Sequence, residues 1–226
     1  MSGSPRPHIA VIDPAVRVPE LDNFNRLVLD HAPFAFSLHL PALFGMGSLE
    51  SLPRPPDALI IFGSGASVYD QLPWQELFNA YLRDQIQRKI PMLGICYGHQ
   101  LLAHLLGGTI TYATEDQYKY KGLRSVHFCQ SGFWGKAGEE GAFVVSHREI
   151  VKTLPNSCSV FAESATAGIE GFYHESLPLW GIQSHPEAGP EFLKNSEIPL
   201  EPSPQTFVSG RTFLKGFFHH LFPQYS

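Results

Sequence analysis

The sequence of 226 residues has only three cysteines, few charged residues and no long apolar run. Cys96, Cys129 and Cys158 are too few and too far apart for a disulfide framework or a zinc knuckle, and their odd number leaves at least one free thiol. No window approaches the roughly 20 apolar residues of a membrane span, and the first residues include no apolar stretch of signal-peptide length. We therefore expect a cytoplasmic protein with no membrane partner.

Charge is sparse as well. Charged residues make up 16% of the sequence, against about 25% in ordinary soluble proteins. The 16 Lys and Arg residues are outnumbered by 21 Asp and Glu residues, and they form no basic stripe, so nucleic acid is not an expected partner. The 11 histidines are scattered without the spacing of a metal site, and we expect neither a metal nor a cofactor.

Apolar material, by contrast, is plentiful, with 43% hydrophobic residues of which 17 are Phe. This composition excludes a disordered polar chain and suffices for a sizeable core. Three apolar runs, at 9–12, 58–62 and 92–95, each predict a short strand buried on both faces, as in a parallel sheet. Helical spacing at 20–31 and 74–89 separates these strands, and the alternation of strand and helix predicts an α/β fold.

The second half of the chain has a different texture. A helix follows Cys96, and beyond it short alternating segments predict strands with little helix until a closing helix at 207–222. Segments 41–56 and 132–141 are expected to be surface loops. Because no internal repeat and no long linker occur, residues 1–226 are expected to form one domain. Further strands are predicted at 34–38, 109–112, 123–128, 143–146, 159–162, 169–173 and 179–184.

The most informative motif is Gly94-Ile95-Cys96-Tyr97-Gly98-His99-Gln100, which places a cysteine where a buried strand meets a helix. Glycines two residues before and after Cys96 permit the sharp turn of a nucleophile elbow. A cysteine at a helix N-terminus is favoured as the thiolate by the helix dipole and the free N–H groups. An isolated free cysteine is usually a small buried hydrophobe, but this context predicts that Cys96 is a nucleophile.

A thiolate nucleophile needs an acid and base partner, and His185 is the candidate. It follows an apolar strand, and Glu187 stands two positions later, close enough to orient the imidazole through its second nitrogen. The set predicts a triad of nucleophile, base and orienting carboxylate. Without the elbow, the simpler interpretation would be a histidine at a strand end beside a solvated glutamate.

These motifs resemble a known family. The run 94–100, closed by Gly107-Gly108, and the run Gly181-Ile182-Gln183-Ser184-His185-Pro186-Glu187 are similar to those of class I glutamine amidotransferases, most closely the amidotransferase domain of GMP synthetases. The resemblance extends over residues 57–187. It implies a flavodoxin-like α/β fold in which helices flank a central, mostly parallel sheet with a smaller antiparallel extension.

The resemblance also implies a chemistry. Cys96 would attack the side-chain amide of glutamine and form a glutamyl thioester, while His185, held by Glu187, protonates the departing ammonia and then activates water. The backbone N–H groups of Ser64 and Tyr97 match the family's oxyanion hole, where losing one donor typically costs on the order of 10²–10³ in rate. The positions that match the family's substrate-binding site are Gly65, Gln100, Ser146 and His147.

Two departures from the family pattern are visible. Where the family usually reads Gly-Gly-Pro, the chain has Gly63-Ser64-Gly65, so a serine stands at an oxyanion glycine. Where the family usually reads Gly-Asp after the later histidine, the chain has Arg148-Glu149, which places a bulky cation near the main-chain end of the substrate. The second departure bears on the identity of the substrate more than on the chemistry.

Three hypotheses of function follow. In the first, the protein hydrolyses glutamine and its ammonia reaches an acceptor on a partner synthetase chain, because the amidotransferase resemblance leaves no room in 226 residues for an ATP-using domain. In the second, the same residues hydrolyse γ-glutamyl peptides without a partner. In the third, the protein is a silent regulatory or binding protein, against which the complete set of Cys96, His185 and Glu187 argues.

Overall fold

A nine-stranded sheet runs through the computed structural model, which describes residues 6–225. Its strand order is β2-β1-β3-β4-β11-β10-β9-β6-β7, and all neighbours from β2 to β11 are parallel. The remaining strands pair antiparallel. The parallel strands are β1 (His8–Ile12), β2 (Ala35–His39), β3 (Ala58–Ile61), β4 (Met92–Ile95) and β11 (Leu179–Ile182). The antiparallel strands are β6 (Tyr120–Phe128), β7 (Glu140–His147), β9 (Cys158–Ser164) and β10 (Gly168–His174).

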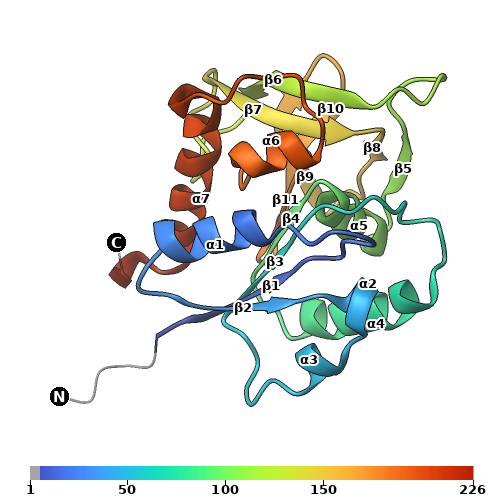
Figure 1. The fold of residues 1–226 in the computed structure, drawn as a ribbon, viewed down its shortest axis with the longest axis vertical. Helices are drawn as coiled ribbons and strands as arrows, with labels where there is room; N and C mark the ends of the chain where they lie inside the picture. The colour runs from blue at the N-terminus through green and yellow to red at the C-terminus, as the bar shows by residue number, and fades with distance from the viewer. Residues whose placement is uncertain (1–5, 226) are drawn as a thin grey trace.

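Helices cover both faces of the parallel part of the sheet (Figure 1). One face packs against α1 (Leu21–Asp30) and α7 (Val208–Leu221), and the other against α4 (Pro73–Gln87) and α5 (Tyr97–Leu105). Strand β1 shows why both faces are covered, because its successive side chains are apolar and point to opposite faces. Ile9 and Val11 pack in the core on the α1 and α7 side, and Ala10 packs in the core on the α4 and α5 side. The predicted α/β fold with a central, mostly parallel sheet is confirmed.

Several elements differ from the sequence prediction. Segment 41–56 is not wholly a loop, since it contains the single-turn helices α2 (Pro41–Phe44) and α3 (Gly47–Glu50). The strand β8 (Glu149–Thr153), which pairs with β5 (Thr109–Tyr112) in a separate two-stranded sheet, was not predicted. Helix α6 was also missed. Short helices complete the chain: α6 (Pro190–Asn195), η1 (Pro204–Phe207) and η2 (Pro223–Tyr225).

The segment 132–141 is an anchored loop instead of a solvated one. Trp134 is only 8% exposed, and its indole stacks on Phe161 with ring centroids 4.1 Å apart. Phe133 packs edge-on against Phe213 of α7. These aromatic side chains are therefore part of the core, which the Gly-rich composition of the segment conceals.

The parallel strands bring several polar residues to one edge of the sheet. Ligand sites in such sheets lie at the carboxyl ends of the strands. Gly63 lies shortly after β3, Cys96 follows β4, and Gln183 follows β11. Because β3, β4 and β11 are adjacent, these residues meet although up to 120 positions separate them in the chain. Within residues 6–225, none of the helices combines the length and apolarity needed to cross a bilayer.

Candidate active site

Cys96 occupies the sharp turn between β4 and α5. Its backbone has φ 51° and ψ −102°, a strained conformation for a residue with a side chain. A Cβ on Gly94 would overlap the Gly98 carbonyl oxygen, and a Cβ on Gly98 would overlap the Ile61 carbonyl oxygen. Both glycines are therefore required for the close approach of strand and helix, as the motif predicted.

His185 lies beside the cysteine. A Cβ on Gly63 would be 3.0 Å from His185 Cε1 and 3.9 Å from Cys96 Sγ, so the imidazole and the thiol flank the same small residue. The opposite ring nitrogen, Nδ1, contacts Glu187 Oε1 at 2.8 Å, and both side chains are buried. The structure thus brings the three predicted triad residues together, although 89 positions separate Cys96 from His185 in the chain.

The surroundings of His185 favour its charged form. Burial by itself lowers the pKa of an imidazole, but the Glu187 carboxylate and the neighbouring Cys96 outweigh this and raise the pKa of His185 to about 10. The surroundings therefore favour the imidazolium, with Nδ1–H donated to Glu187. The second proton, on Nε2, is the one available to a reacting group.

Two further carboxyl groups stand near Glu187. Burial raises the pKa of Asp13 to about 6, although its side chain accepts N–H groups from Glu20 at 2.7 Å and Ala15 at 3.0 Å. Burial, followed by the charges of Glu187 and Asp13, raises the pKa of Glu20 to about 7. Asp13 thus fixes the loop after β1, and Glu20 changes charge near neutral pH at the wall of the site.

The two predicted oxyanion donors differ in what their side chains do. The Ser64 hydroxyl donates to the Pro14 carbonyl at 2.7 Å and accepts the Ala66 N–H at 3.1 Å, so it is held by the loop. The Tyr97 hydroxyl accepts from Gln75 at 3.0 Å, within the core on the α4 side. As the first residue of α5, Tyr97 has a backbone N–H without a partner inside the helix. The groups of Ser64 and Tyr97 that could stabilise an oxyanion are therefore their backbone N–H groups, not their side chains.

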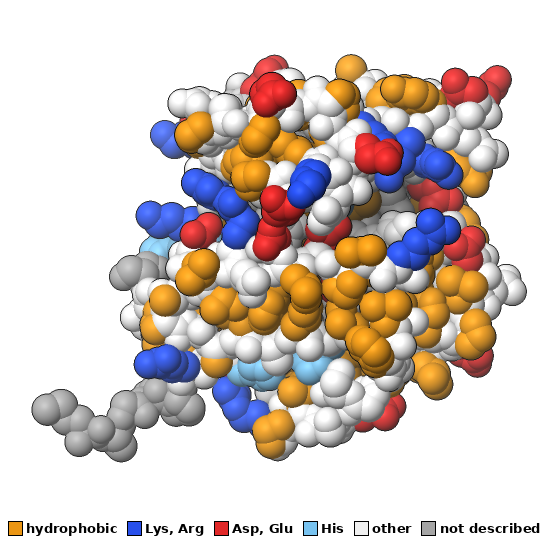
Figure 2. All heavy atoms as spheres, viewed as in Figure 1, with side chains coloured by type: hydrophobic (Ala, Val, Ile, Leu, Met, Phe, Trp, Pro, Cys, Tyr) orange, Lys and Arg blue, Asp and Glu red, His pale blue; other side chains and the backbone are white. Residues whose placement is uncertain are grey.

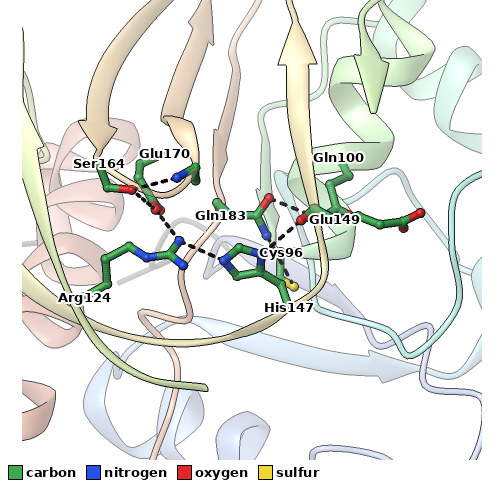
Figure 3. A network of polar contacts seen from close by, with 9 residues as sticks. Cys96, Gln100, Arg124, His147, Glu149, Ser164, Glu170 and Gln183 are labelled. Atoms are coloured by element: carbon green, nitrogen blue, oxygen red, sulfur yellow. Dashed lines mark hydrogen bonds and ion pairs between the residues drawn. The ribbon is translucent and has the colours of Figure 1, made fainter. Parts of the chain in front are cut away.

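Gln100 and His147 belong to one polar network, drawn in Figure 3. Gln100 Nε2 donates to the Glu149 carbonyl oxygen at 2.7 Å and to Gln183 Oε1 at 3.1 Å. His147 contacts Arg124 through Nε2 at 2.8 Å and the Glu149 carbonyl through Nδ1 at 3.1 Å. Gln100 and His147 both line the cleft, and these hydrogen bonds hold their side chains in place.

The cleft above Cys96 is large, with a volume of about 790 Å³. Its wall includes all nine predicted site residues except Tyr97, whose side chain lies in the core. Arg148 lines the cleft, and the carboxylate of Glu149 accepts the Ser67 hydroxyl at 2.9 Å across its mouth. Arg17 and Lys119 contribute further cations. Figure 2 shows the corresponding hollow with basic side chains on its rim.

Sequence reasoning assigned no role to several residues that meet at this site. Gln183 Nε2 lies 3.7 Å from Cys96 Sγ, and Arg124 forms a buried ion pair with Glu170. Gln183 had a signal, because it stands two positions before His185 in the second motif, the spacing that also separates His185 from Glu187. Arg124 and Glu170 had a weaker signal, since each is a charged residue in phase with the buried apolar residues of its own strand, Val126 and Phe128 for Arg124 and Phe172 for Glu170.

Comparisons with known proteins identify the family of this chain. The family model described as glutamine amidotransferase class-I matches residues 48–198. The glutamine-hydrolysing GMP synthase subunit of Pyrococcus abyssi is 30% identical over 152 residues, which are 65% of this chain and 78% of the relative. The corresponding subunit of Methanopyrus kandleri is 34% identical over 117 residues, and the GMP synthase of Bacteroides fragilis is 31% identical over 161. These two matches cover 50% and 66% of this chain, but only 62% and 30% of the two relatives.

Solved structures share the fold over nearly the whole chain. A structure described as a GMP synthase subunit from Thermoplasma acidophilum matches with a TM-score of 0.74 at 20% identity, covering 98% of this chain and 97% of that one. A glutamine amidotransferase from Thermotoga maritima matches with a TM-score of 0.72 at 17% identity, covering 96% and 99%. With the family model matching more than half of its residues, the chain belongs to the class I glutamine amidotransferase family.

Proposed function

We propose that the protein hydrolyses the side-chain amide of glutamine through a thioester on Cys96. The observation that carries this proposal is the buried His185–Glu187 pair, at 2.8 Å, beside a cysteine held at a strained strand-to-helix turn. A nucleophile, an acid and an orienting carboxylate that lie side by side support acyl transfer at this site. A family name alone would not establish activity, so the proposal depends on these contacts.

The steps follow from the protonation states. The Cys96 thiolate attacks the amide carbon, and the oxyanion that forms is stabilised by the N–H groups of Ser64 and Tyr97. His185 gives its Nε2 proton to the leaving nitrogen, ammonia departs, and a C–S thioester remains. The neutral imidazole then takes a proton from water, the hydroxide attacks the thioester, and the C–S bond breaks. Glutamate leaves, and the thiolate and imidazolium are restored.

Gln100 has a defined part in binding. Because both of its side-chain N–H groups are used by Glu149 and Gln183, the atom it can offer to a ligand is its carbonyl oxygen. We infer that this oxygen accepts the α-ammonium group of the substrate. The α-carboxylate is then left to the main-chain groups of Ser146 and His147 and to the cations of the cleft wall, which Gly65 also lines.

Glutamine hydrolysis is testable on the protein alone. We expect equal amounts of glutamate and ammonia from glutamine, and a covalent adduct on Cys96 with a glutamine analogue that carries a diazoketone in place of the amide. Asparagine, one methylene shorter, should react at least about tenfold more slowly, because the reacting carbon no longer reaches the thiolate. Mass spectrometry of the adduct is informative even if turnover needs a partner. Absence of both adduct and glutamate would overturn the proposal.

A partner chain is part of the proposal. The relatives from Pyrococcus abyssi and Methanopyrus kandleri are named as subunits of a GMP synthase. We infer that ammonia produced at Cys96 is delivered to an acceptor on a synthetase chain. The activity should then rise when that partner and its second substrate are present, as ammonia is consumed instead of released.

The cleft also favours a second substrate class, γ-glutamyl peptides. A volume of about 790 Å³ lies within the range of pockets for drug-sized ligands and exceeds what glutamine alone would fill. Lys119 and Arg148 line this space and, among residues 6–225, neither forms a salt bridge, whereas the nearby Lys121 pairs with Glu197 at 3.3 Å. Free cations in this place suit a substrate with an acidic tail beyond the scissile bond.

The acidic-tail hypothesis makes a quantitative comparison possible. We expect Lys119→Met to raise KM for γ-glutamyl-glutamate several-fold while leaving KM for γ-glutamyl-alaninamide nearly unchanged, because only the first peptide has carboxylates beyond the scissile bond for the ammonium to attract. Lys121→Met is the matched control, since its ammonium is already paired. Steady-state release of the amine product measures both constants. Equal changes for the two peptides would contradict a site for the tail.

A further inference from the structure

We propose that Gln183 is a catalytic residue whose side-chain N–H stabilises the Cys96 thiolate, and that a polar network beginning at Arg124 fixes this amide in the donating orientation. The proposal rests on the proposed role of Cys96 as nucleophile. It adds a donor to the sulfur that is separate from His185. The contact that carries it is the one between Gln183 Nε2 and Cys96 Sγ, at 3.7 Å between two buried side chains.

The orientation of the network is decided at its far end. Arg124 is anchored by the fully buried Glu170, which also accepts the Ser164 hydroxyl at 2.7 Å. A guanidinium can only donate, so the Nε2 atom of His147, 2.8 Å away, must accept. The proton of His147 is therefore on Nδ1, and it is donated to the Glu149 carbonyl.

The same logic passes from one group to the next toward the sulfur (Figure 3). The Glu149 carbonyl only accepts, so the amide of Gln100 must present its NH₂ group there. The second N–H of that group points to Gln183, whose oxygen must then be the atom that faces it, at 3.1 Å. With its oxygen so occupied, Gln183 presents its NH₂ group to Cys96. Each orientation is fixed because the preceding group in the network can act there only as a donor or only as an acceptor.

Burial makes this orientation persistent. Gln183 is fully buried and Gln100 is 4% exposed, so a rotated amide would face a donor with a donor and leave groups unpaired. Burial, followed by the charge of Arg124, lowers the pKa of His147 to about 3, which keeps the ring neutral across the working pH range. The network therefore delivers the same donor to the sulfur at any pH near neutral.

The test measures the thiolate without any substrate turnover. The rate of Cys96 alkylation by iodoacetamide is followed from pH 5 to pH 10, with the modified residue identified by mass spectrometry. In Gln183→Met we expect the midpoint of the profile to move about one pH unit upward, which is about a tenfold lower rate below the midpoint. The plateau at high pH should be unchanged, because a fully formed thiolate no longer depends on the donor.

A second variant keeps the size of the side chain. Gln183→Glu retains an oxygen for Gln100 but turns an oxygen toward the sulfur, so the midpoint should move upward at least as far. Gln85→Met is the matched control, because Gln85 is a buried glutamine on α4 that does not line the cleft. Its profile should coincide with that of the unmodified protein.

Three results would overturn the role of Gln183. These are an unchanged midpoint in both Gln183 variants, an equal shift in Gln85→Met, or a lower plateau with an unchanged midpoint, which would indicate structural damage only. A protein that fails to hydrolyse glutamine still gives an alkylation profile. The failure of the proposed function and the failure of this inference are therefore distinguishable.

Discussion

Cys96→Ala is expected to reduce glutamine hydrolysis by at least about 10⁴-fold, because covalent catalysis ends when the nucleophile is removed. What remains would be the contribution of the oxyanion donors and of binding. The variant keeps the backbone of the elbow, since alanine, like cysteine, must adopt the conformation with φ 51°. Glutamate release measured over hours, with the same substrate concentration as for the unmodified protein, gives the ratio.

The other two cysteines provide the controls for this prediction. Burial raises the pKa of the Cys129 and Cys158 thiols, so both remain protonated at neutral pH and are poor nucleophiles. Neither lines the cleft. Cys129→Ala and Cys158→Ala should retain activity within about twofold. If Cys96→Ala kept more than a tenth of the activity while remaining folded by circular dichroism, a different nucleophile would have to be sought.

The elbow could be predicted from the sequence because its requirements are local. Gly94 and Gly98 are needed on either side of Cys96 for steric reasons that involve only the adjoining strand and helix and one neighbouring strand. The position of His185 could be inferred only through the second motif. What places it beside the thiol is the parallel pairing of β11 with β4, in which Ile182 is the partner of Ile95.

The polar network could not be predicted, for a different physical reason. Arg124, Glu170 and His147 lie on three strands of the antiparallel part of the sheet, and each is in phase with buried apolar residues of its own strand. The alternation places them on the inward face but does not show which polar groups they meet there. Their burial depends on how β6, β7 and β10 are arranged with the segments after them. A pairing that spans 46 positions, as between Arg124 and Glu170, leaves no local pattern.

The order of the strands also explains how the site combines two kinds of support. The parallel strands β4 and β11 supply Cys96 and the segment that carries His185, both on a rigid, fully buried frame. The antiparallel strands supply Arg124, His147 and Glu170, the groups that orient the side-chain amides of Gln100 and Gln183. Chemistry at the sulfur therefore depends on packing in both halves of the sheet.

Glu187→Gln is expected to reduce kcat on the order of 10⁴-fold, the loss typical of replacing the orienting carboxylate of a triad by its amide. An amide can turn its NH₂ group toward Nδ1 of His185, which favours the tautomer with the proton on the wrong nitrogen. The loss of the carboxylate also removes the largest attraction that raises the pKa of His185. That pKa should fall, and the alkaline limb of the rate profile should move to lower pH.

The same substitution should change how stability depends on pH. In the unmodified protein the pKa of His185 is raised above its ordinary value of 6.5 to about 10. The resulting stabilisation is fully present below pH 6.5 and is lost as pH rises toward 10. In Glu187→Gln the pH at which this contribution disappears should be lower, which denaturant unfolding at several pH values can measure.

Glu191 provides a control for the effect of replacing a glutamate by glutamine near the site. Glu191 is four positions further along, half exposed, and pairs with Lys194 on the surface of α6. Glu191→Gln should leave both the rate and its pH profile unchanged, because surface ion pairs contribute little. If Glu187→Gln lost less than tenfold and kept the alkaline limb in place, the imidazole would be oriented by something other than Glu187. The buried contact at 2.8 Å would then be structural, and Cys96 would have to draw its acid from another group in the cleft.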